Sequence, residues 1–207
     1  CTTCGDSYEA DFTEATGHTF SEWETVKDAT FTEDGEETRI CLKCDHVEFR
    51  PVALTIITSG NFGAGTTPTD QVTYTLYSNG TMVVAGKGAT YYCNWDAGSQ
   101  PFIEYRSQVK HLIIEEGITL INRGSFAYFD NLETLSLPST VTEIQGNAFM
   151  ASFVKDVMQI TIPKSVNTIG VAAFGSSSGE TFFTDIVIEN PDIQFQSKTN
   201  YYYHAVF

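Results

Sequence analysis

The feature that most constrains the fold is a pattern that occurs three times between residues 112 and 174. The copies align without gaps over residues 112–126, 135–149 and 160–174, so the pattern repeats after 23 and then 25 residues. Apolar side chains fill the same five columns in every copy, namely 112/135/160, 114/137/162, 118/141/166, 121/144/169 and 126/149/174. A fixed period of roughly 20–50 residues indicates stacked supersecondary units. We therefore expect a repeat architecture.

The spacing of the columns predicts the shape of each unit. The first two columns are two residues apart, which places their side chains on one face of a short strand. The other columns can point into the same core as the chain turns back. One unit cannot bury its own apolar face, so the units must stack into a solenoid. Ile186–Ile188 begin a fourth, less regular unit, and Phe207 is the expected closing aromatic residue.

The repeats resemble the BspA-like leucine-rich repeat family, whose consensus combines a short strand, a Pro-Ser-Val-x-x-Ile-Gly turn and an Ala-Phe closure. Ile162–Gly170, followed by Ala173 and Phe174, is similar to that consensus, and Glu116–Ile121 looks like the usual first repeat. The resemblance covers roughly residues 72–190. In this family such modules typically lie on bacterial surface or secreted proteins and are associated with adhesion and protein interaction. The resemblance therefore implies an extracellular or cell-surface module that binds and does not catalyse.

Residues 52–108 precede the repeats and are predicted to form strands. Alternating apolar residues over 72–76, the turn Ser78–Gly80 and a returning apolar run over 82–85 predict a β-hairpin. Such a hairpin would cover the open end of the solenoid, which is otherwise an unpaired edge. The expected fold is mainly β with short helices and turns. It comprises a small acidic cysteine-containing β module over 1–51, a β cap over 52–108 and a leucine-rich-repeat solenoid over 109–207.

The charge of the chain narrows the choice of partners. The net charge is −15, and because nucleic-acid binding depends on Lys and Arg neutralising phosphates, a nucleic-acid partner is excluded. The first fifty residues hold 13 acidic and 4 basic residues, and the charge density falls near Pro51, which indicates a boundary. No stretch approaches the ~18 consecutive apolar residues of a membrane span. The chain begins at Cys1 and ends at Phe207 abruptly, so we expect it to be part of a longer secreted or surface protein.

Two Cys-x-x-Cys pairs, Cys1/Cys4 and Cys41/Cys44, are the sharpest chemical motif. Four thiolates can hold Zn²⁺ tetrahedrally, and a small polar module would gain folding free energy from the metal. His46, two residues after Cys44, is an alternative ligand. The 37 positions from Cys4 to Cys41 exceed the spacing of zinc ribbons, and in an oxidising compartment the same pairs form disulfides. Structural zinc and disulfides both remain open, with free thiols as a third possibility.

No motif in the sequence predicts catalysis. Gly175–Gly179 matches G-x-S-x-G, but a nucleophile elbow needs a strand that leads straight into a helix, whereas these residues form a Ser/Gly loop. No histidine has a partner at a recognisable ligand or triad spacing; the four are His18, His46, His111 and His204. We therefore predict that the chain is not an enzyme and that it needs no cofactor apart from the structural zinc considered above.

An aromatic group before the first repeat suggests an alternative function. Exposed rings at Tyr91, Tyr92, Trp95 and Tyr105 could stack on sugars, which would make the chain a glycan-binding accessory module of a larger surface enzyme. Packing in the core of the cap accounts for the same rings without a ligand, and also for Phe102 beside them. The expected partner is thus a protein or a glycan at a surface.

Overall fold

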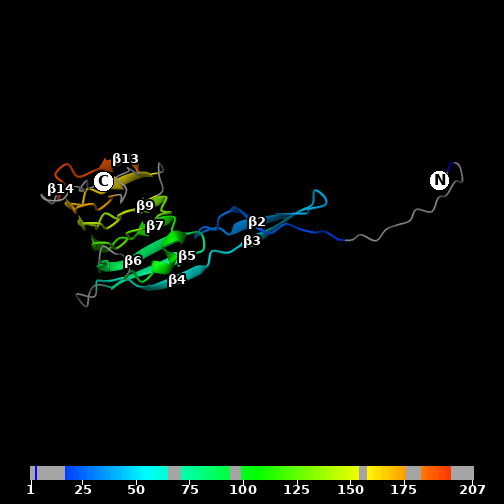
Figure 1. The fold of residues 1–207 in the computed structure, drawn as a ribbon, viewed down its shortest axis with the longest axis horizontal. Coiled ribbons are helices and arrows are strands. Elements are labelled where there is room, and N and C mark those ends of the chain that lie inside the picture. Colours follow the sequence, from blue (N-terminus) through cyan, green and yellow to red (C-terminus); the bar gives the residue numbers. More distant parts are fainter. Residues whose placement is uncertain are drawn as a thin grey trace. The chain divides into compact units, whose positions relative to one another are not determined.

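The computed structural model describes residue 3 and residues 17–64, 71–93, 99–153, 158–175 and 183–196. The chain divides into two compact units, Cys1–Leu54 and Thr55–Phe207, and both contain strands (Figure 1). Within the described ranges, the regular structure consists of strands and one 3-10 helix, η1 (Ile103–Gln108). The predicted mainly-β class is therefore confirmed. None of the helical structure described is long and apolar enough to span a membrane.

The N-terminal unit contains a three-stranded antiparallel sheet in the order β1-β2-β3. Its strands are β1 (Glu24–Lys27), β2 (Gly35–Ile40) and β3 (Val47–Val52). Opposite charges face each other across β2 and β3, where Glu37 pairs with Arg50 and Arg39 with Glu48, each ion pair at 2.6 Å. The guanidinium groups of Arg39 and Arg50 lie 4.7 and 4.4 Å from the centre of the Trp23 ring. Charge pairing and cation–π contacts thus hold this face of the sheet.

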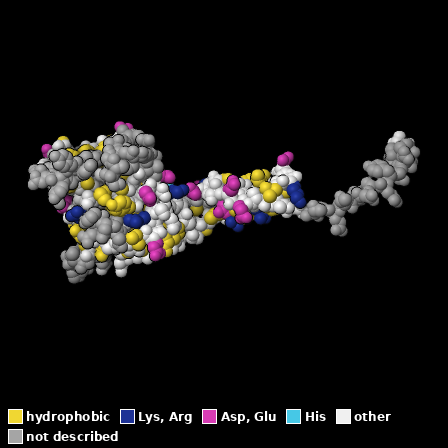
Figure 2. Space-filling model, in the orientation of Figure 1, with side chains coloured by type: hydrophobic (Ala, Val, Ile, Leu, Met, Phe, Trp, Pro, Cys, Tyr) yellow, Lys and Arg dark blue, Asp and Glu magenta, His cyan; other side chains and the backbone are white. Residues whose placement is uncertain are grey.

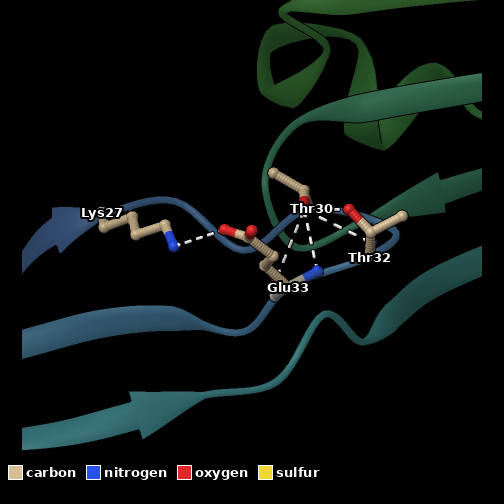
Figure 3. Close-up of polar contacts among 4 residues, drawn as sticks. All are labelled: Lys27, Thr30, Thr32 and Glu33. Carbon is tan, nitrogen blue, oxygen red and sulfur yellow. Dashed lines mark hydrogen bonds and ion pairs between the residues drawn. The ribbon is translucent and has the colours of Figure 1, made fainter.

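Thr30 closes the turn between β1 and β2 (Figure 3). Its hydroxyl oxygen accepts hydrogen bonds from the backbone N–H groups of Thr32 and Glu33, at 3.3 and 3.0 Å. The Glu33 carboxylate also pairs with the Lys27 ammonium at 2.7 Å, and this contact holds the pKa of Glu33 below its usual range. A threonine hydroxyl that bonds nearby backbone groups fixes a turn locally. This connection therefore forms with little apolar burial.

The C-terminal unit is a β-solenoid of about four turns over residues 81–195. Each turn adds one strand to a first stack and one strand to a second stack. The first stack comprises β7 (His111–Ile114), β9 (Thr134–Ser136), β11 (Met158–Ile162) and β13 (Phe183–Ile188). The second stack comprises β8 (Ile118–Ile121), β10 (Glu143–Ile144), β12 (Thr168–Ile169) and β14 (Gln194–Phe195). The paired strands of both stacks run parallel, so the predicted solenoid is confirmed. Figure 1 shows the successive turns of the C-terminal unit stacked on one another.

Tight turns form the third side of the solenoid and carry the aromatic column. The backbone N–H of Phe126 donates to Ala148 O at 2.8 Å, and the N–H of Phe149 donates to Ala173 O at 2.7 Å. These bonds place equivalent phenylalanines above one another. The centroid of the Phe149 ring lies 5.4 Å from that of Phe126 and 5.1 Å from that of Phe174, and the three rings are nearly parallel. All three rings are at most 1% exposed, so this column forms the interior wall of the repeats.

The apolar columns form one core, with a partial exception in the second repeat. The members of the third, fourth and fifth columns are buried, as are Ile160 and Ile162. Leu135 and Leu137 are half-buried and pack against this core, so the expectation that these columns are buried together with their counterparts is met only in part there. In the described residues β9 forms a ladder with β7 but none with β11. Because backbone pairing does not draw the next strand against β9, the side chains of this strand are covered incompletely.

The hairpin predicted before the repeats is present and caps the solenoid. Its strands belong to the antiparallel run β4 (Ile56–Asn61), β5 (Gln71–Tyr77) and β6 (Thr81–Ala89). β6 then pairs in parallel with β7 through residues 81–84 and with β8 through Gly88 and Ala89. β6 is therefore shared by both stacks, and it forms the first turn of the solenoid as well as its cap.

Buried polar groups join this cap to the first repeat. The hydroxyls of Thr90 and Ser125 lie 2.8 Å apart, and the side-chain amide of Asn122 donates to Thr90 O at 2.6 Å. The amide of Gln100 donates to the carbonyls of Gly124 and Ser125, both at 3.0 Å. Gln100 Oε1 is buried without a hydrogen-bond partner, whereas the donors and acceptors named above are paired, and paired polar groups in a low-dielectric interior stabilise a specific arrangement. The cap and the first repeat are thus bonded as one structure.

Candidate functional site

A group of potential metal ligands lies at one end of the small sheet. The donor atoms of His18, Cys41 and Cys44 all lie within 4.8 Å of one another. Cys41 directly follows β2, and Cys44 lies in the connection to β3. His18 joins them because Phe20 forms an antiparallel bridge with Cys41, which brings the preceding segment alongside the end of β2. Two thiols and one imidazole could therefore hold one metal ion.

The local geometry favours the thiolate form of Cys41. The backbone N–H of Lys43 donates to Cys41 Sγ at 3.4 Å, and this hydrogen bond is the largest cause of a pKa that falls to about 6. Hydrogen bonds from His18 and Cys44 lower the pKa further. Cys44 Sγ lies 3.3 Å from His18 Nδ1. The thiolate, and not the thiol, is the form of cysteine that acts as a nucleophile and binds metals. Cys41 is therefore largely in its reactive form at neutral pH.

We expect the metal-free, reduced chain to show this low pKa directly. Thiolate absorbance near 240 nm should rise by one thiolate as the pH rises through about 6, and the Cys41→Ser variant should lack that step. Cys93→Ser, in the other unit, serves as the matched control and should retain it. If every cysteine instead titrates at the ordinary value of about 8.5, the bonding around Cys41 is not as described.

The structure changes the set of metal ligands that the sequence suggests. Cys1 and Cys4 lie outside the described residues, whereas Cys41 and Cys44 are free thiols. His18 was missed, because it is 23 and 26 residues away from these cysteines and no linear spacing connects them. His46 does not belong to the donor group, but its ring stacks on that of His18 with centroids 4.4 Å apart. The bridge at Phe20, a tertiary contact, is what assembles the group.

The outward face of the first strand stack is a second candidate site. Side chains alternate along these strands, so Leu112 and Ile114 point into the core while His111 and Ile113 face outward. Pairing places Ser136 beside Ile113 and Val187 beside Thr161. We define the first-strand face as the outward residues of the stack: His111, Ile113, Thr134, Ser136, Gln159, Thr161, Asp185 and Val187. Apart from Asp185 and the titratable His111, these side chains are uncharged.

A shallow hollow of about 500 Å³ borders this face at the end of β7 and β9. Its lining residues are Ile114, Glu115, Glu116, Ser136, Leu137 and Pro138. The Glu116 carboxylate accepts hydrogen bonds from the backbone N–H and the hydroxyl of Ser139, at 2.9 and 3.0 Å. These bonds lower the pKa of Glu116, which keeps the carboxylate ionised. The hollow thus adds fixed negative charge beside an uncharged surface.

The aromatic residues proposed for sugar stacking are divided between surface and core. Tyr91 and Tyr92 are 37% and 48% exposed. Tyr105 lies in η1 and packs against the core, while Phe102 is fully buried. Trp95 lies outside the described residues. The two exposed tyrosines are therefore the described side chains of this group that are most accessible to a ligand.

Two features of the sequence bear on catalysis, namely His111 and the G-x-S-x-G match at residues 175–179. His111 Nδ1 lies 2.9 Å from the hydroxyl of Thr134, on the first-strand face. Residues 176–180, which include most of the G-x-S-x-G match, lie outside the described residues. A repeat stack uses its inward positions for packing and offers mainly a shallow outer surface.

The period, the parallel strand stacks and the inward apolar columns define a leucine-rich-repeat solenoid. The family profile described as BspA type leucine-rich repeat region (6 copies) matches residues 98–202, which is half of the chain. The chain therefore belongs to the BspA-type leucine-rich repeat family, and the resemblance seen in the sequence is confirmed. Solenoids of this class are typically non-catalytic.

The chain is also similar to a crystal structure of a leucine-rich repeat protein from the bacterium Eubacterium ventriosum. The sequences are 19% identical, the TM-score is 0.50, and the match covers 70% of this chain and 41% of that chain. At this identity the likeness shows the fold alone, and this chain spans less than half of that protein. No curated protein matches the chain.

Proposed function

We propose that this chain is a non-catalytic protein-interaction module of a secreted or surface-displayed bacterial protein, and that it binds its protein partner through the first-strand face. The observation that carries the proposal is the largely uncharged, outward-facing surface that runs over β7, β9, β11 and β13, with Asp185 as its acidic side chain. Repeats of the BspA type are commonly surface protein-interaction repeats, which supports the same role. Adhesion to another cell or to a host surface is the process we assign to it.

The character of this face suits a protein partner. The chain as a whole carries a net charge of −15, yet the first-strand face is largely free of charged side chains. The centres of protein–protein interfaces are depleted in charged residues because burying a charge costs solvation. Parallel backbone pairing also holds each half of the face, β7 with β9 and β11 with β13, so little conformational entropy is lost within each pair on binding. The acidic hollow beside it adds a polar rim that favours a partner with a basic edge.

The proposal is tested with a panel of purified extracellular and bacterial surface proteins whose affinities are measured individually. We expect the double variant Ser136→Arg/Thr161→Arg to weaken binding of the captured protein at least about 10-fold, since two unpaired charges would be buried. The matched control Thr119→Arg/Thr142→Arg adds the same charge on the side formed by the second stack of strands, away from the first-strand face. This variant should bind like the parent chain. Equal weakening by both variants, or no binding to any protein in the panel, would contradict the proposal.

A glycan-binding role is the second candidate, and the exposure of Tyr91 and Tyr92 favours it. Exposed aromatic rings offer flat apolar faces with a polar tip, which suits sugar stacking. A glycan array separates the two candidates. Binding to a defined sugar that is lost in Tyr92→Ala or Trp95→Ala, but kept in Ser136→Arg/Thr161→Arg, would assign the function to the aromatic group.

A further inference from the structure

The described part of the small N-terminal unit, residues 17–54, buries few apolar side chains for a folded module of its size. Among its described residues, the buried apolar side chains are Ala29 and Cys41. Larger apolar side chains are exposed, including Leu42 at 65% and Phe49 at 63%. Figure 2 shows hydrophobic side chains at the surface of this unit among its charged groups. Small units of this kind usually need disulfides or a structural metal in place of a core.

The donor group at the end of β2 has the composition and spacing of a zinc site. With Zn–S near 2.3 Å and Zn–N near 2.0 Å, sulfur and nitrogen ligands on a tetrahedral ion lie about 3.5 Å apart. Cys44 Sγ and His18 Nδ1 are 3.3 Å apart, and all three donor atoms lie within 4.8 Å of one another. Small side-chain rotations would therefore bring all three onto one ion. Thiolate and imidazole ligands together favour Zn²⁺ over Mg²⁺ or Ca²⁺.

Hydrogen bonds and a ring contact around the three donor side chains hold them close together, in an arrangement that suits a shared metal ion. The Lys43 N–H points at Cys41 Sγ, and the Cys41 N–H donates to His46 O at 2.9 Å, which fixes the loop that carries Cys44. The His46 ring stacks on His18 and limits its rotation. Outer contacts of this kind orient metal ligands and contribute to affinity. His46 remains stacked and outside the donor group, so the described part of the chain supplies three ligands for the ion.

We propose that His18, Cys41 and Cys44 bind one Zn²⁺ that ties the segment before β1 to the end of β2 and stabilises the small unit. This ligand set differs from the four-cysteine set that the sequence suggests, because it uses His18 and does not require Cys1 or Cys4. The ion links residues 23 and 26 positions apart, so it closes the unit around its sheet. Binding free energy at such a site contributes directly to folding.

Titration of the reduced, metal-free full chain with Co²⁺, followed by displacement with Zn²⁺, tests the proposal. We expect one ion per chain, tetrahedral d–d bands and a sulfur-to-cobalt charge-transfer band of two thiolates. His18→Ala and Cys44→Ser should each weaken binding by about 100-fold or more, beyond the effect of losing an outer contact. His18→Cys should restore binding and raise the charge-transfer intensity to three thiolates. That rescue shows a ligand role, since a purely structural histidine would not be replaced by a thiol.

Two matched controls leave the proposed ligands intact. Cys1→Ser/Cys4→Ser and Cys93→Ser should bind Co²⁺ with the parent affinity and spectrum, and Zn²⁺ should raise the unfolding temperature of the small unit in both. A band of four thiolates, or loss of binding in Cys1→Ser/Cys4→Ser, would overturn the ligand set. Absence of binding at micromolar Co²⁺, or a Cys41–Cys44 disulfide in the unreduced chain by mass spectrometry, would overturn the site altogether.

Discussion

Replacing Phe149 with alanine is expected to lower the free energy of unfolding by about 3–5 kcal/mol, as for other fully buried aromatic residues. The ring is 0% exposed and lies between Phe126 and Phe174, with Phe153 also at its edge. Its removal leaves a cavity in the middle of the column. The neighbouring rings cannot fill this cavity unless the turns that carry them shift, because backbone hydrogen bonds hold these turns together. Each repeat contacts mainly its neighbours, so the loss is felt in both adjacent turns.

Urea unfolding followed by circular dichroism measures this loss. Val187→Ala is the control, because Val187 is 42% exposed on the first-strand face and should change stability by no more than about 0.5 kcal/mol. A loss of less than about 1 kcal/mol for Phe149→Ala would contradict the stacked column, because such a small effect is typical of a surface position.

Replacing Gly117 with alanine is expected to destabilise the solenoid by at least about 3 kcal/mol. Gly117 has a φ of +105°, which side chains rarely adopt, and strain of this kind costs on the order of 1–3 kcal/mol. A β-carbon there would also lie 2.3 Å from Gly86 O, a backbone atom that cannot rotate away. Relief requires β6 and the start of β8 to separate, which breaks the hydrogen bond from Gly88 N–H to Gly117 O.

The same urea experiment tests this substitution. Thr119→Ala, two residues along the same segment and exposed, should be close to the parent chain in stability. Because the junction joins the cap to the first repeat, Gly117→Ala should also increase amide exchange along β6 and β8. A fully stable Gly117→Ala chain would show that the cap does not pair with the repeats as described.

The repeat region could be predicted because its signal recurs. A single strand-like segment such as Ile160–Ile162 is ambiguous alone, but three aligned copies fix the strands, the turns and the inward columns together. Burial of Leu135 was overestimated, since the pattern carries no information on whether β9 and β11 pair. The sequence also did not predict that β6 belongs both to the cap and to the first turn of the solenoid. Its pairing with both β7 and β8 depends on the path of the chain between these strands, which no local pattern encodes.

The metal ligands were less predictable than the fold. Cys41 and Cys44 were visible from their spacing, but His18 enters the group through the bridge between Phe20 and Cys41, a contact that no local pattern encodes. Similarly, the recurring apolar columns at 112 and 114 predicted which side chains on β7 face inward, while the sequence of that strand, with Ile113 facing outward, cannot specify what binds there. Surface chemistry constrains a partner without identifying it.

Site-specific photo-crosslinking tests the central claim, binding through the first-strand face, most directly. A photoreactive side chain would be placed at Thr161 on that face and, in a second variant, at Thr142 on the side formed by the second stack of strands, each in the presence of a protein that the chain binds. We predict efficient crosslinking from position 161 and little from position 142. Crosslinking from position 142 alone, or from Tyr92 alone in a third variant, would contradict the assignment of the first-strand face as the binding surface.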